Sequence, residues 1–127
     1  MLILSVSAFA GSERFIGAWK SNKAATLAYL KVHTKLTSQQ LDKVATALGT
    51  LTITFDKTNM TMQQGSWSFV SPYKIISETT NSITIESKDP ATKKLAPTIL
   101  EFDGNCFWTP DDKIPGYKER FDKINKK

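Results

Sequence analysis

The sequence predicts an α+β fold in which a strongly bent antiparallel sheet of about seven strands forms an open or small closed barrel. Two observations predict it. A short amphipathic helix over residues 37–48 leads directly into an alternating strand over 51–55. Short alternating runs separated by turn residues then fill most of the chain as far as residue 108. A closed barrel removes free sheet edges, and a half-open cone of cystatin-like or NTF2-like type is the alternative.

The helix before the sheet has the clearest local signal. Thr37 and Gln40 have the spacing of a capping box, which predicts that the helix begins there. Gly49 stands where a left-handed residue commonly ends a helix. One apolar stripe is formed by Leu41, Val44, Ala45 and Leu48. An earlier helix over 24–32, with Asn22 as a candidate cap, completes a helix pair inserted after a first strand at 15–20 and lying across one end of the sheet.

The end of the chain predicts a further helix. Tyr117, Phe121 and Ile124 follow the helical spacing i, i+4, i+7, so the chain from Gly116 onward is expected to form an amphipathic helix that packs outside the sheet. Before it, Asp103-Gly104 is a strong hairpin signal between two strands.

Length and composition fit one soluble domain. The chain has 127 residues, of which 40% are hydrophobic and 23% charged. No apolar run reaches the roughly 20 residues that cross a bilayer. The net charge of +5 weakly favours anionic partners.

The first ten residues differ from the rest of the chain. Residues 1–10 carry no charge and end in Ala8-Phe9-Ala10, a small-x-small pattern typical of a signal-peptidase site. We therefore expect a signal peptide whose true start lies upstream, a single domain over 11–127, and a periplasmic or secreted protein. The alternative is a hydrophobic first strand or helix of the fold.

The inventory of reactive residues predicts neither an enzyme nor a metal or cofactor site. His33 is the one histidine and Cys106 the one cysteine, whereas zinc sites need three or four such ligands. No local signature surrounds either residue, and Cys106 on a strand is expected to be a small core residue. No glycine-rich phosphate loop is present.

Large side chains on alternating strand positions are the candidate ligand-binding residues. Apolar pockets carry mainly such side chains with a few polar anchors, and a packed core is the alternative, more common role of the same residues. The predicted ligand is small and apolar or amphipathic. The candidates are Met60, Met62, Trp67, Phe69, Phe102 and Trp108.

A basic stretch supports a second function. No Asp or Glu occurs between Arg14 and Leu41. This stretch could bind an acidic protein or an anionic membrane surface, which would make the protein an interaction module such as an inhibitor or an envelope accessory factor. A solvated helix face is the alternative, and nucleic acid is not expected because interleaved aromatic residues are missing. The candidate basic patch comprises Lys20, Lys23, Lys31 and Lys35.

The first strand carries a family resemblance. Residues 15–20, Phe-Ile-Gly-Ala-Trp-Lys, resemble the Gly-x-Trp strand of the calycins, which include lipocalins and fatty-acid-binding proteins. The order of one strand, two helices and then antiparallel strands is similar to that of the fatty-acid-binding proteins. The whole chain also resembles small uncharacterised exported bacterial proteins. The resemblance implies a barrel with its mouth capped by the helix pair.

The resemblance covers only two residues directly, Gly17 and Trp19, and it implies that this tryptophan closes the base of the barrel. Two features depart from the family. Residues 51–108 hold about six strands, fewer than such a barrel needs. The Arg-x-Tyr pairing of the last strand is absent, since Phe121 and Asp122 follow Arg120. Carboxylate-anchoring residues are therefore not carried over.

Overall fold

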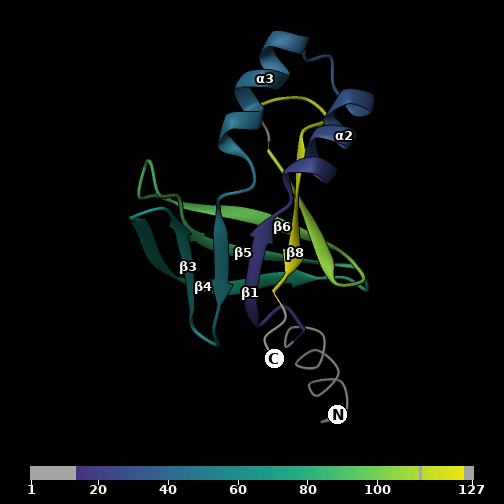
Figure 1. Ribbon diagram of the computed structural model, residues 1–127. Coiled ribbons are helices and arrows are strands. Elements are labelled where there is room, and N and C mark those ends of the chain that lie inside the picture. Colours follow the sequence, from purple (N-terminus) through teal and green to yellow (C-terminus); the bar gives the residue numbers. More distant parts are fainter. Residues whose placement is uncertain (1–13, 112, 125–127) are drawn as a thin grey trace.

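The computed structural model describes residues 14–111 and 113–124. Within these residues, eight antiparallel strands form a closed barrel in chain order, and two helices lie between the first and second strands (Figure 1). The helices are α2 (Lys23–His33) and α3 (Ser38–Ala47). The strands are β1 (Gly17–Ser21), β2 (Thr52–Phe55), β3 (Asn59–Gln64), β4 (Trp67–Glu78), β5 (Ser82–Lys88), β6 (Leu95–Asp103), β7 (Cys106–Pro110) and β8 (Lys118–Lys123).

The barrel closes because β1 has a partner on each side. Trp19 of β1 lies opposite Ile53 of β2 on one side and opposite Lys123 of β8 on the other. The predicted antiparallel barrel with a helix pair after its first strand is confirmed, with eight strands instead of about seven. The half-open cone is wrong. The eight-stranded barrel is consistent with a calycin-like fold.

The predicted C-terminal helix is wrong, because Lys118–Lys123 forms strand β8. Phe121 of β8 is 1% exposed and lies opposite Phe107 of β7 and Ser21 of β1. The segment supplies ladder partners to two strands at once, and this tertiary demand overrides the helical preference of its Lys, Glu and Arg residues. The apolar spacing around Phe121 resembles that of a helix, but the segment is a strand, and Phe121 occupies one of its inward positions.

Both helices begin at the caps that the sequence predicts. Asn22 Oδ1 accepts a hydrogen bond from the Ala25 N–H at 2.9 Å. Thr37 Oγ1 accepts from the Gln40 N–H at 3.2 Å, and Gln40 Oε1 accepts from the Thr37 N–H at 2.8 Å, which completes the capping box. Gly49 has a φ of +89°, in the left-handed region favoured by glycine. No helix of the described residues is long and apolar enough to cross a membrane.

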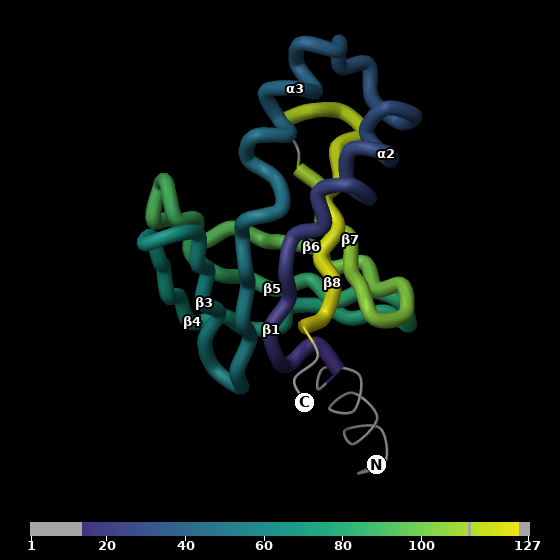
Figure 2. Tube along the Cα trace, viewed as in Figure 1, coloured from purple at the N-terminus to yellow at the C-terminus, as the bar shows by residue number. Residues whose placement is uncertain are grey.

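The helix pair lies beyond one end of the barrel, where β1 ends and β2 begins (Figures 1 and 2). We call this the helix end, and the opposite end, where β1 begins and β8 ends, the base. Helix α2 packs against β8 and contacts α3. Two side chains of α2, Thr26 and Leu30, are fully buried. The helix pair therefore lies across one end, as predicted.

The hydrophobic core lies toward the base. Trp19 is 1% exposed, and its indole Nε1 donates to the carbonyl of Phe15 at 2.8 Å. Its ring meets that of Phe107 edge-on, with the centroids 4.9 Å apart, and Lys123 Nζ lies 5.1 Å from its centroid. Trp19 is therefore a packed residue of the barrel core. The core comprises Phe15, Trp19, Ile53, Phe55, Met60, Ile83, Ile85, Leu100, Phe102, Phe107 and Phe121.

Candidate ligand-binding site

The inside of the barrel changes character between the base and the helix end. Alternate residues of a strand share a face, so the inward positions can be followed along each strand from its buried core residue. On five strands the inward side chain changes from a large apolar group to a small or polar one. These pairs are Trp19 and Ser21 on β1, Ile85 and Ser87 on β5, Leu100 and Thr98 on β6, Phe107 and Thr109 on β7, and Phe121 and Glu119 on β8.

A pocket of about 420 Å³ opens between β6 and β7, on the helix-end side of the core. The ladder between these strands covers only Glu101–Asp103 with Cys106–Trp108, although β6 begins at Leu95 and β7 continues to Pro110. The two strands separate beyond this ladder. The pocket is lined by Asp89, Ala96, Pro97, Thr98, Thr109, Pro110, Asp111, Lys113, Tyr117 and Glu119.

Glu119 is held in the pocket lining by a hydrogen bond from the start of the helix pair. Its Oε2 accepts a hydrogen bond from the Ser21 hydroxyl at 2.7 Å, and the same hydroxyl oxygen accepts from the Gly49 N–H at 2.9 Å. Burial raises the pKa of Glu119, the Ser21 hydrogen bond opposes this, and the nearby charge of Asp111 adds to the increase. A partly desolvated carboxylate of this kind can anchor a hydrogen-bond donor.

Other polar groups of the pocket are fixed by their own loops. Burial raises the pKa of Tyr117 to about 12, and neighbouring carboxylates contribute, so its phenol remains neutral at physiological pH. The N–H groups of Thr92 and Ala91 lower the pKa of Asp89 by donating to its Oδ1 at 3.0 and 2.8 Å. The lining thus presents three carboxyl groups and one ammonium group, that of Lys113.

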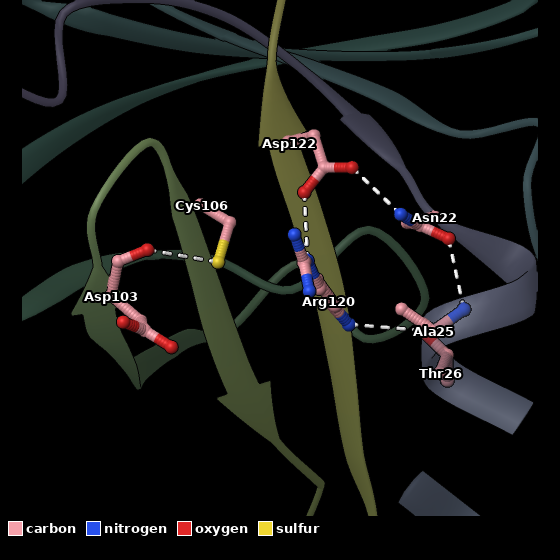
Figure 3. Close-up of polar contacts among 7 residues, drawn as sticks. All are labelled: Asn22, Ala25, Thr26, Asp103, Cys106, Arg120 and Asp122. Atoms are coloured by element: carbon pink, nitrogen blue, oxygen red, sulfur yellow. Dashed lines mark hydrogen bonds and ion pairs between the residues drawn. The ribbon is translucent and has the colours of Figure 1, made fainter. Parts of the chain in front are cut away.

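The start of α2 is tied to β8 by a set of hydrogen bonds (Figure 3). Asp122 accepts hydrogen bonds from Asn22 Nδ2 at 2.7 Å and from Arg120 Nε at 2.8 Å. The Arg120 N–H donates to Thr26 Oγ1 at 3.0 Å. Because Ser21 directly precedes the helix cap, these contacts also fix its hydroxyl against the pocket carboxylate.

Two of the predicted ligand-binding residues belong to the core. Met60 is 3% and Phe102 is 9% exposed, and both pack within the buried cluster. Met62 is half-buried against the same cluster. The side chains of Met60 and Phe102 therefore fill the base of the barrel, which is the packed-core alternative for these residues.

The other three predicted ligand-binding residues lie nearer the surface. Trp67 and Phe69 stack with centroids 6.4 Å apart, Trp67 is 45% exposed, and Lys93 Nζ lies 4.7 Å from the Phe69 ring. Trp108 has its ring centroid 4.9 Å from that of Tyr29 on α2. Among the described residues, the six predicted side chains therefore divide into a group in or against the core and a group nearer the surface.

The four predicted basic residues are exposed, but they form two separate pairs. Lys20 and Lys23 line a depression of about 610 Å³ that also contains Asp122. Lys31 lies about 12 Å farther along α2, and Lys35 follows the helix. The acid-free stretch is therefore divided, and β8 contributes a carboxylate to one half. Binding of an acidic partner at these lysines stays a prediction.

Cys106 is a buried core residue, as predicted. It is 4% exposed, and its thiol donates to the carbonyl of Asp103 at 3.1 Å (Figure 3). Burial raises the pKa of Cys106, the charge of Arg120 opposes this, and two nearby carboxylates add to the increase. The thiol is therefore poorly suited to nucleophilic attack. Among the described residues, no group of three or more His, Cys, Asp or Glu side chains could hold a metal ion.

Sequence reasoning missed the pocket residues Thr98, Thr109 and Glu119. A signal was present, because an inward row that changes from large apolar to small polar residues along several strands indicates interior space. It could not be used for Glu119, which stands in a segment with helical apolar spacing.

Comparison with known proteins identifies no relative of this chain. No protein-family model matches the chain, and no curated protein or solved structure matches it significantly. The likeness to the calycins therefore consists of the barrel, the inserted helix pair and the buried tryptophan of the first strand.

Proposed function

We propose that the protein is a non-enzymatic exported binding protein that holds a small amphipathic ligand in the pocket between β6 and β7. One observation carries the proposal: a pocket of about 420 Å³ joins the apolar side chains of Ala96, Pro97 and Pro110 to the half-buried carboxyl group of Glu119. Small-molecule sites typically combine an apolar wall with a few polar anchors. The export component rests on the uncharged residues 1–10, which lie outside the described residues.

The lining chemistry favours a ligand with a hydrogen-bond donor or a positive charge at one end. Three carboxyl groups and the ammonium group of Lys113 surround the pocket, and Glu119 can accept from a ligand through the oxygen that Ser21 leaves free. The prolines suit the apolar end of the same molecule. The predicted amphipathic ligand is thus kept, and its proposed site moves from the Met and aromatic side chains named from the sequence to the pocket between β6 and β7.

The test is a titration of the ¹⁵N-labelled protein at pH 7 with three probes that share one ring system: tryptamine, indole and indole-3-propionate. Tryptamine is expected to shift the amide signals of Thr98, Thr109 and Glu119 more than the neutral or anionic probe does. The anionic probe is a strict control, because the net charge of +5 favours it over the surface as a whole.

Two variants test whether the carboxyl group of Glu119 is the group that binds tryptamine. E119Q should weaken tryptamine binding about tenfold, since a charge-assisted hydrogen bond is lost. E101Q removes a carboxylate from the outer face, where Glu101 pairs with Lys118 Nζ at 2.7 Å, and should leave binding unchanged. Equal shifts with the cationic and anionic probes, or no shifts at these amides, would contradict the proposal.

A further inference from the structure

Strands β6 and β7 separate from each other, but each remains paired with its other neighbour in the barrel. Strand β6 pairs with β5 over all of Leu95–Glu101, and β7 pairs with β8 over all of Cys106–Pro110. The ladder between β6 and β7 nevertheless stops after Glu101 opposite Trp108. Each strand is therefore held on its far side, and the opening does not result from general fraying of the barrel.

The register explains why the ladder stops. In an antiparallel pair, the residues that exchange backbone hydrogen bonds recur at every second position. The Phe102 N–H donates to Asn81 beside β5, so the odd-numbered residues of β6 direct their backbone groups toward β7. After Glu101 with Trp108, the next such pair would be Ile99 with Pro110.

Prolines occupy both sides of the missing ladder. Pro110 has no N–H to donate to the Ile99 carbonyl, and Pro97, at the next position of β6 whose backbone faces β7, has no N–H to donate across the gap. Both prolines also line the pocket. Proline inside a sheet is otherwise restricted to edges and bulges because it removes a ladder hydrogen bond. Here the two residues fall where they prevent the same pair of strands from joining.

From this register we infer that Pro97 and Pro110 hold the side of the barrel open between β6 and β7, and that ligands reach the pocket through this opening. The claim that ligands enter here, the access component, rests on the proposed function. The claim that the prolines keep the strands apart, the structural component, does not. A residue with an N–H at position 110 allows the ladder to extend by one more pair, which narrows the pocket entrance.

The experiment compares P110V and P97V/P110V with P72V as the matched control. Pro72 is likewise a strand proline, exposed as Pro97 is, but it lies on β4 and does not line the pocket. Backbone amide exchange is measured by NMR, and tryptamine affinity by the same titration as above. In P110V the Ile99 amide should become about tenfold more protected, corresponding to one added ladder pair, and tryptamine should bind at least about tenfold more weakly. P72V should change neither quantity.

Amide protection and affinity test the two components separately. Unchanged protection of Ile99 in a folded P110V overturns the role of the prolines. Increased protection with unchanged tryptamine affinity overturns the access route. If wild-type protein binds no probe, the proposed function fails and the Ile99 amide alone decides the structural component. Should the double variant not fold, P110V carries the test.

Discussion

The base and the helix end of the barrel are built from the same strands, yet their interiors differ. Along β5, Ile83 and Ile85 are buried in the core, and Ser87 takes the next inward position toward the helix end. Along β8, Phe121 lies in the core and Glu119 in the pocket. Large rings close the base without leaving polar groups, whereas small and polar side chains leave room at the helix end. One strand can therefore supply a packed core at one end and line a pocket at the other.

The largest expected effect on stability comes from removing an aromatic ring from the core at the base. Phe107 is fully buried, with ring centroids 4.9 Å from Trp19 and 5.2 Å from Phe121. F107A should lower the free energy of unfolding by about 3–5 kcal/mol, because the surrounding rings cannot fill the cavity. F69A, at a half-buried position toward the helix end, should cost about 1 kcal/mol.

Urea unfolding monitored by circular dichroism measures both changes. The comparison between the two halves fails if the two variants lose similar stability, because the helix end would then be as tightly packed as the base.

An intermediate effect is expected in the β7–β8 loop, which passes beside the helix pair above the barrel (Figure 2). Gly116 has a φ of +81°, and a Cβ at this position would lie 2.3 Å from the carbonyl oxygen of His33. G116A should cost about 2–3 kcal/mol, since both the backbone conformation and the contact with α2 are strained.

The matched control is G65A in the β3–β4 turn. Gly65 also has a positive φ, +59°, but a Cβ there meets nothing within 4 Å, so its cost should be about 1 kcal/mol. Thermal unfolding gives the difference. If G116A is no less stable than G65A, the contact between the loop and α2 does not contribute to the stability of the helix end.

Local features of this fold could be predicted from the sequence, and nonlocal ones could not. The caps at Asn22 and Thr37 depend on residues three positions away, so their spacing identified both helices. Strand β8 depends on ladders with β1 and β7, which lie far apart in the chain, and its local pattern favoured a helix. The roles of Pro97 and Pro110 appear only once the register of β6 and β7 is known. The candidate site was missed for the same reason, because its residues come from separate strands and loops.

The smallest expected effect concerns the pocket carboxylate and its pH dependence. Burial raises the pKa of Glu119 in the folded protein. The carboxyl group of Glu119 therefore stays protonated to a higher pH in the folded state than in the unfolded chain. The resulting stabilisation is complete below the unfolded-state pKa, and it is lost as pH rises through the folded-state pKa. E119Q lacks this titration. Its stability relative to wild type should thus rise between pH 4 and pH 7, on the order of 0.5 kcal/mol.

The control for this last comparison is a carboxylate on the outer face of the barrel. E101Q loses the ion pair with Lys118 Nζ and should be about 0.5 kcal/mol less stable than wild type at pH 7. Urea midpoints of wild type and both variants, measured at several pH values, give the change in relative stability for E119Q. A fall for E119Q as pH rises would mean that its hydrogen bond with Ser21 outweighs the burial of its charge.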